Sequence, residues 1–371
     1  MKMIKNFLLI LISSFIALFL AELILASFYP QARNGSWRIQ NEDGVYLNKN
    51  TGKSRHEFLG KKEKISINYK FGKYHNRIIH DDKYSTNPSK ILVLGDSNVF
   101  GWLLDDENTF IAKIQKFFKD YYFINSAAGG FSDTDMYLFI DRYCKGIKPE
   151  YILYFIDVDR SIRKKNIKID DRNKLIINKN KQHQLKKTIN KNKVFLYVLE
   201  NTHLMQLIKK IYVNLSNEAY IDYVIKEDPN IKKIKKKIEN FSKDENEKKI
   251  IKSKKKTSEK IKLKNDFVLI GKLFSKILQS SQECNAELIF IDLAWYDKDY
   301  NSEIYNHVVE NFNEMFESKD NVNFISIYDE MRISKKTNKN YKLEEGHPNT
   351  EGNLIIFDNL SNKLKKYLNQ N

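Results

Sequence analysis

The three residue types that acyl transfer requires occur in this sequence in settings that single them out. Ser97 follows a short apolar run and a Gly-Asp pair, and His347 lies between a glycine and a proline, three residues after Glu344. A nucleophilic serine needs a base within hydrogen-bond reach of its hydroxyl and a third group that orients that base. Because two side chains three apart on a tight turn can point the same way, we expect Glu344 to bond Nδ1 of His347 while Nε2 faces Ser97.

The setting of Ser97 indicates the end of a buried strand. Residues 91–94 are aliphatic, and Gly95 allows a tight exit. Parallel strands of open α/β folds deliver polar side chains to the carboxyl edge of the sheet, where such folds build their sites. A purely structural role is the alternative, because serine often caps or turns a chain. A single histidine in a loop is likewise more often a surface or packing residue.

The elements around Ser97 alternate between apolar strands and amphipathic helices. We expect strands at 90–94, 121–125, 151–156, 286–293 and 322–328, and helices at 105–118, 136–145, 267–278, 304–316 and 353–368. This alternation predicts an α/β fold with a doubly wound parallel sheet of about five strands between helical layers, a flavodoxin-like three-layer arrangement.

The remainder of the chain divides around this core. The expected parts are an anchor segment at 1–30, an extension at 31–89, the main domain at 90–160 with 266–371, and a Lys-rich, partly helical insertion at 161–265. In the extension we expect a strand or two packing beside the main domain, without chemistry of their own. The insertion contains one well-patterned amphipathic helix near 194–208, suited to a lid or to a membrane surface, among charged segments typical of solvated surface.

The first 30 residues carry a targeting signal. Lys2 and Lys5 precede an apolar stretch, 7–29, whose single charge is Glu22. This length suffices for a helix that spans a membrane, and the positive residues would stay inside, which sends the rest of the chain across. We therefore expect a single-pass anchor and an extracytoplasmic main domain. A cleavable signal peptide is the alternative, with a passable cleavage site at 24–26.

The composition limits which classes of partner and cofactor we expect for this chain. The chain carries 64 Lys and Arg against 47 Asp and Glu, a net charge of +17. We attribute this excess to a composition rich in Lys, Asn and Ile, since no nucleic-acid-reading motif is present, and attraction to an anionic membrane surface stays open. No metal-ligand spacing or phosphate loop occurs, so no cofactor and no metal are expected. Cys144 and Cys284 permit one disulfide, with two buried thiols as the alternative.

Four short stretches give the chain a resemblance to the SGNH (GDSL-type) hydrolases, and in particular to their membrane-anchored bacterial members. In the family's order they read Gly-Asp-Ser at 95–97, Asn-Ser-Ala-Ala-Gly-Gly at 125–130, Asp-Val-Asp at 157–159 and Glu-Glu-Gly-His-Pro-Asn at 344–349. The resemblance covers the main domain and leaves the insertion unmatched. It implies a three-layer SGNH fold and hydrolysis of esters.

The resemblance implies a role for individual residues. Ser97 becomes the nucleophile, and His347 becomes the general base and then the general acid. Glu344 takes the place of the family's usual Asp, with Glu345 as the less favoured candidate. The backbone N–H groups of Ser97 and Gly130 would hold the oxyanion, and glycine suits the second position because the backbone must approach closely there.

One position departs from the family pattern. Val158 occupies the place where the family has an Asn whose amide is the third oxyanion donor. Loss of one such donor costs on the order of 10²–10³ in rate. Asn98, directly after the nucleophile, is a candidate replacement through its side-chain amide. The alternative is that Asn98 caps the following turn.

Three functions follow, in order of preference. The first is a membrane-anchored, extracytoplasmic serine esterase that removes an O-acyl group, acetyl among the candidates, from an envelope glycan or lipid. The second is an O-acyltransferase of cell-surface polysaccharide, which would use the same acyl-enzyme. The third is a catalytically impaired SGNH domain with a binding role, motivated by Val158.

Overall fold

A computed structural model of the chain describes residues 2–35, 37–41, 45–79, 88–156, 167–169, 175–177, 193–212, 269–293, 322–337 and 340–368. The chain divides into two compact units, one of Met1–Gly35 with Leu185–Lys262 and one of Ser36–Gln184 with Leu263–Asn371. The helix expected at 304–316 and the Asp-Val-Asp stretch at 157–159 lie outside the described residues.

Five parallel strands form the centre of the larger unit. They run in the order β12-β11-β8-β6-β7, with bounds Val322–Ser326, Glu287–Asp292, Tyr151–Ile156, Ser89–Leu94 and Tyr121–Asn125. Every neighbouring pair in this series is parallel. The strands are continuous apolar runs because both faces of the sheet are covered, and residues 91–94 are fully buried. The predicted, mostly parallel central sheet is confirmed.

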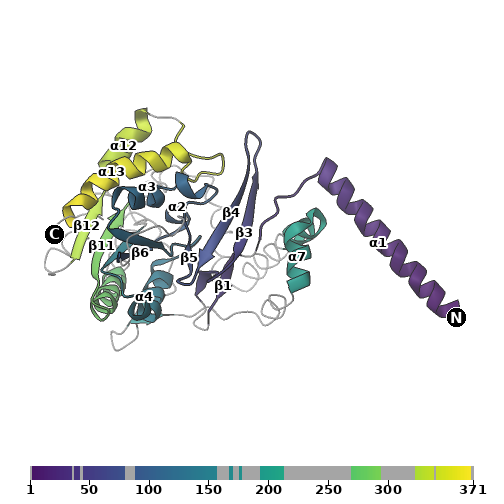
Figure 1. Ribbon diagram of the computed structural model, residues 1–371, viewed down its shortest axis with the longest axis horizontal. Coiled ribbons are helices and arrows are strands. Elements are labelled where there is room, and N and C mark those ends of the chain that lie inside the picture. Colours follow the sequence, from purple (N-terminus) through teal and green to yellow (C-terminus); the bar gives the residue numbers. More distant parts are fainter. Residues whose placement is uncertain are drawn as a thin grey trace, which may run out of the picture. The chain divides into compact units, whose positions relative to one another are not determined.

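Helices lie on both faces of this sheet (Figure 1). One face carries α3 (Phe110–Phe117), α12 (Tyr328–Thr337) and α13 (Thr350–Leu368), and the other carries α4 (Asp133–Ile147) and the helix at 269–282. Thr109 caps α3, and a capping box of Ser132 and Asp135 begins α4. α12 was not predicted. The fifth strand ends two residues earlier than expected, because the N–H of Tyr328 bonds the Ser326 hydroxyl at 3.2 Å and a helix begins there.

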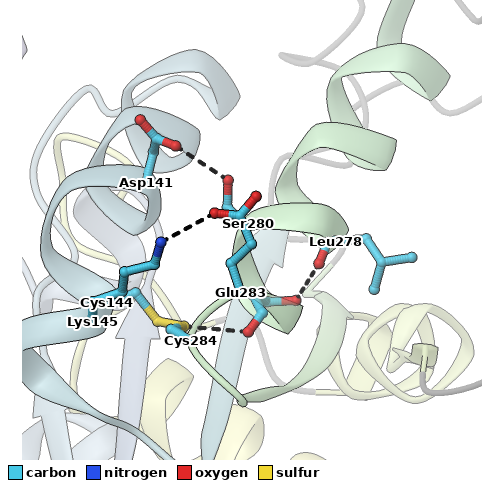
Figure 2. Close-up of a disulfide and its surroundings, with 8 residues drawn as sticks. Asp141, Cys144, Lys145, Leu278, Ser280, Glu283 and Cys284 are labelled. Atoms are coloured by element: carbon cyan, nitrogen blue, oxygen red, sulfur yellow. Dashed lines mark hydrogen bonds and ion pairs between the residues drawn. A yellow bond between two sulfur atoms is a disulfide. The ribbon is translucent and has the colours of Figure 1, made fainter.

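A disulfide between Cys144 and Cys284 joins α4 to the turn that follows the helix at 269–282, as Figure 2 shows. An ion pair between Lys145 and Glu283, at 3.2 Å, lies beside it. This result decides between the disulfide and the pair of buried thiols that the sequence left open. The bridge connects two helices on one face of the sheet, far along the chain from each other.

The extension contributes strands to the sheet itself, which corrects the expectation that it would pack beside the main domain. β4 (Lys64–Gly72) pairs antiparallel with both β3 (Lys53–Leu59) and β5 (Asn76–Arg77), and β5 pairs antiparallel with β7. The result is an eight-stranded mixed sheet. Two further hairpins stand apart from it: β1 (Arg38–Gln40) with β2 (Tyr46–Asn48), and β9 (Ile167–Ile169) with β10 (Leu175–Ile177).

The smaller unit contains a long apolar helix, α1 (Lys2–Phe28). Its stretch Met3–Phe28 is long and apolar enough to cross a membrane, by length and composition, and its side chains are not buried. A membrane anchor and a signal peptide both have this character.

The amphipathic piece of the insertion belongs to the same unit and is split in two. The sequence predicts one helix near 194–208, whereas the chain forms α7 (Lys193–Asn201) and a second helix at 203–212. The Glu22 carboxylate of α1 accepts the N–H groups of His203 and Leu204, at 2.7 and 2.8 Å. The only charge in the apolar stretch of α1 therefore caps the N-terminus of the second helix.

Candidate active site

Ser97 lies where β6 ends, at the point where the sheet order reverses between β7 and β8. Open α/β sheets bind their ligands at such points. Gly95 makes the turn possible, because a Cβ there would lie 2.5 Å from Cγ2 of Val99. Asp96 then caps the short helix α2 (Ser97–Phe100), its carboxylate accepting the N–H of Asn98 at 2.9 Å. Ser97 thus stands at the first position of a helix, with 8% of its surface exposed.

A buried arginine braces the loop that follows α2. The side chain of Arg77 is fully buried, and it donates to the carbonyl oxygens of Phe100 and Gly101 at 3.0 and 2.6 Å. The same guanidinium pairs with Asp106 at 2.8 Å. These bonds satisfy a buried charge and fix the backbone beside Ser97. Arg77 comes from β5, in the extension that seemed to carry no chemistry.

His347 is held by a tight loop ahead of α13. The N–H of Gly346 bonds the carbonyl of Leu343 at 3.0 Å, and the N–H of Leu343 bonds the carbonyl of His347 at 2.8 Å. Asn349 accepts the N–H of Gly352 at 2.9 Å, which begins the helix. This loop places His347 Nε2 2.7 Å from the Ser97 hydroxyl oxygen. The structure therefore brings together the serine and the histidine that the sequence singled out.

The acidic partner of His347 is Glu345, and the expected contact with Glu344 is wrong. Oε2 of Glu345 lies 2.5 Å from His347 Nδ1. Leu343 and Gly346 close a β-turn, so the two glutamates occupy its central positions and their side chains diverge. The three-residue spacing of Glu344 and His347 predicts side chains on the same side of this turn, whereas the turn directs them to different partners.

Glu344 instead bonds the hairpin turn between β3 and β4. Its carboxylate accepts the N–H groups of Lys61 and Lys62, at 3.1 and 3.0 Å, and its own N–H donates to the Glu63 carboxylate. The Lys62 and Lys61 amides lower the pKa of Glu344 below its usual range. Contact is close enough that a Cβ on Gly60 would lie 2.2 Å from Oε2 of Glu344. We call this set of contacts the hairpin clamp.

The hydrogen bonds of His347 define its tautomer. A carboxylate only accepts hydrogen bonds, so the proton of the neutral imidazole lies on Nδ1, facing Glu345. Nε2 is then free to accept the Ser97 hydroxyl proton. The other carboxylate oxygen of Glu345, Oε1, is buried and has no hydrogen-bond partner among the described residues. The arrangement is that of a nucleophile, a base and an orienting acid.

The Gly-Gly pair after β7 lies beside Ser97. A Cβ on Gly129 would lie 2.8 Å from the Trp37 ring and 3.9 Å from Cβ of Ser97. Gly130 has a φ of +75° and is exposed. These positions agree with a backbone approach to substrate at Gly130, and its part in an oxyanion hole with the Ser97 N–H stays a prediction.

Val158 and Asn98 are the two positions considered for the third oxyanion donor, and the structure describes only Asn98. Val158 lies outside the described residues. The side-chain amide of Asn98 donates to Asp96 Oδ2 at 3.3 Å, and its Oδ1 has no partner among the described residues. This bond directs the Asn98 amide toward the cap of α2. The capping itself falls to Asp96, not to Asn98 as the alternative had it.

Several residues of the site gave no signal in the sequence. Trp37 packs against Phe100 and Trp102, with ring centroids 5.0 and 5.3 Å apart, and the Trp102 ring lies 6.3 Å from that of His347. These residues come together only through long-range contacts, so no local sequence motif predicts that they surround the site. Among the described residues, no group of three His, Cys, Asp or Glu side chains could hold a metal ion.

Comparisons with known proteins give structural likenesses only. No family model matches the chain, and no curated protein matches its sequence. The psychrotrophic esterase EstA from Pseudoalteromonas sp. is 12% identical with a TM-score of 0.41, and 76% of this chain covers 100% of that one. A lipolytic protein of the G-D-S-L family from Veillonella parvula is 9% identical with a TM-score of 0.40, at 76% and 100% coverage. The acetylxylan esterase Axe2 from Geobacillus stearothermophilus, as a catalytic mutant, is 10% identical with a TM-score of 0.38, at 76% and 96% coverage. At these values the function has to be argued from the site itself.

Proposed function

We propose that this chain is a serine hydrolase that cleaves acyl esters, with Ser97, His347 and Glu345 as its triad. One observation carries the proposal: an unbroken series of hydrogen bonds runs from the Ser97 hydroxyl through both nitrogens of His347 to the Glu345 carboxylate. A buried serine with a partly buried histidine and a partly buried carboxylate in this order is typical of a catalytic site. The motifs that resemble the SGNH hydrolases support the same assignment.

The geometry suits a two-step reaction. Ser97 Oγ attacks the ester carbonyl carbon and passes its proton to His347 Nε2, while the carbonyl electrons move to the oxygen. Collapse of this intermediate breaks the ester bond, and the leaving alkoxide takes the proton from Nε2. Water then gives its proton to Nε2 and attacks the acyl-serine, after which the acid departs and Ser97 regains its proton. Glu345 stabilises the imidazolium in both steps, and the N–H groups of Ser97 and Gly130 hold the oxyanion.

We place this activity outside the cytoplasm, at a membrane. α1 is apolar and long enough to act as a single-pass anchor, and the lysines that precede its apolar stretch favour an inside N-terminus. The Cys144–Cys284 disulfide supports the same orientation, since such bridges persist in oxidising compartments. The substrate we propose is an O-acyl ester, acetyl among the candidates, on an envelope glycan or lipid.

Active-site labelling of the full chain in detergent tests the proposal. A fluorophosphonate probe should label the wild type and fail to label Ser97→Ala, while turnover of a short-chain 4-nitrophenyl ester falls at least about 10³-fold in Ser97→Ala and His347→Ala. Ser66→Ala, which removes an exposed serine hydroxyl on β4, is the matched control. Labelling that survives in Ser97→Ala, or ester turnover that survives in either triad variant, would remove the assignment.

A further inference from the structure

Arg38 has an unusual position beside the proposed active site. It belongs to β1, and its guanidinium lies over the rings of Tyr46 and Trp37, 4.8 and 5.6 Å from their centroids. Its Nη1 atom lies 3.8 Å from the place where a Cβ on Gly130 would stand. Trp37, the next residue along the chain, also packs against Gly129. The cation is therefore held by two aromatic rings next to the backbone that faces the substrate.

No side-chain or backbone acceptor for this guanidinium is found among the described residues. Within the described ranges, Arg38 makes no side-chain hydrogen bond and no ion pair. The nearby Asp135 carboxylate directs its Oδ2 to Ser132, whose N–H and hydroxyl donate to it at 3.0 and 2.7 Å, and it makes no ion pair with Arg38 among the described residues. Burial lowers the pKa of Arg38, against the opposing fields of Tyr46 and Asp135. The five N–H donors of this partly desolvated cation thus have no acceptor within the part of the chain that the structure describes.

We propose that Arg38 binds an anionic group, a carboxylate or a phosphate, that the substrate carries next to its scissile ester. This inference rests on the proposed function. A planar guanidinium pairs in bidentate fashion with either anion, and its stacking on Trp37 and Tyr46 fixes the orientation in advance. Gly130 is exposed at the same place, so a ligand can reach the donors. The substrate class is then an O-acylated acidic glycan or an O-acylated phosphate-bearing glycan or lipid.

Direct binding to the full chain carrying Ser97→Ala, in detergent, separates this inference from catalysis. Three ligands are titrated by calorimetry. Methyl glucuronoside carries a carboxylate, methyl glucoside is its neutral counterpart, and glycerol 3-phosphate carries a phosphate. We expect at least one anion to bind more tightly than the glucoside, and its affinity to fall about tenfold or more when Arg38→Ala is added. The anion that binds better identifies the source of the charge.

Further variants make the result specific to the guanidinium. Arg38→Lys keeps the charge and loses the planar fork, so it should fall between the wild type and Arg38→Ala. Lys73→Ala removes another cation stacked on a tyrosine, at 4.8 Å from the ring of Tyr74, and should leave the anion affinity unchanged. Thermal unfolding checks that Arg38→Ala is folded. If it is not, Arg38→Gln is the neutral variant to use instead.

Two results would overturn the inference. One is equal affinity for the glucuronoside, the glucoside and the phosphate with Arg38 in place. The other is an anion affinity that Arg38→Ala and Arg38→Gln leave unaltered. Absence of ester turnover in the wild type would instead defeat the proposed hydrolase function, while Arg38-dependent anion binding in the Ser97→Ala chain would still stand.

Discussion

The two halves of the eight-stranded sheet serve the site in different ways. The parallel half supplies the proposed nucleophile, since Ser97 follows directly from the end of β6. The antiparallel half, β3 to β5, supplies no group to the hydrogen-bond series. Instead its hairpin turn holds Glu344, and Arg77 on β5 braces the loop after α2. Ser97 and the groups that hold its surroundings thus come from different parts of one sheet, while His347 and Glu345 come from the loop ahead of α13.

This division is most visible in the two adjacent glutamates. Glu345 bonds His347, and Glu344 bonds the hairpin clamp at Lys61 and Lys62. By fastening one central residue of the turn, the clamp directs the other toward the imidazole. We therefore expect a side chain that does not contact His347 to determine which carboxylate does.

The largest effect in this comparison is expected at Glu345. Glu345→Gln should lower kcat by about 10³–10⁴, because an amide in this place donates to Nδ1 and stabilises the tautomer that cannot take the proton from Ser97. Turnover of a neutral 4-nitrophenyl ester measures this loss. Glu344→Gln is the matched isosteric control, and a greater loss in Glu344→Gln than in Glu345→Gln would restore Glu344 as the orienting acid.

Glu344→Gln should have an intermediate effect. We expect a fall in kcat of about tenfold, since one amide oxygen can still accept a clamp hydrogen bond but the charge that strengthens both bonds is lost. Gly60→Ala should disrupt the same contact from the hairpin side, because its added methyl would clash with the Glu344 carboxylate. If both variants keep full kcat, the clamp does not position the triad.

The clamp also has a pH signature. The folded-state pKa of Glu344 is lowered, so its carboxylate stabilises the fold above the unfolded-state pKa, and this stabilisation is lost as pH falls through the folded value. The difference in melting temperature between the wild type and Glu344→Gln should accordingly be full near neutral pH and vanish in acid. If the difference in melting temperature stays the same at low pH, the stabilisation comes from the packing of the Glu344 side chain and not from its charge.

The smallest effect on catalysis is expected at the disulfide. Replacing Cys144 and Cys284 by serine should leave kcat within about twofold and reduce the free energy of unfolding by about 2–5 kcal/mol, because the bridge closes a loop with a sequence separation of 140. Denaturant titration measures the loss. Alkylation of intact cells tests the orientation at the same time, since in an oxidising compartment the wild-type thiols react only after reduction. Reaction without reductant would place the domain in the cytoplasm.

The parallel half could be predicted because its signals are local. An aliphatic run ending at Gly95 and Ser97, repeated apolar strands and a His-Pro pair ahead of a helix are all readable within a few residues. The choice between Glu344 and Glu345 could not be read this way, because it depends on amides 283 positions earlier in the chain. Arg77 and Arg38 were missed for the same reason, since only tertiary structure shows what surrounds a guanidinium.

The cap that Glu22 forms bears on the maturation of the protein. A signal peptidase cutting after Ala26 would release the segment that carries Glu22, and with it the carboxylate that accepts the N–H groups of His203 and Leu204. The helix at 203–212 would then begin with bare amides at its positive end. Processing would therefore remove the cap of a helix far downstream, and an uncut N-terminus is the form in which the helix at 203–212 keeps that cap.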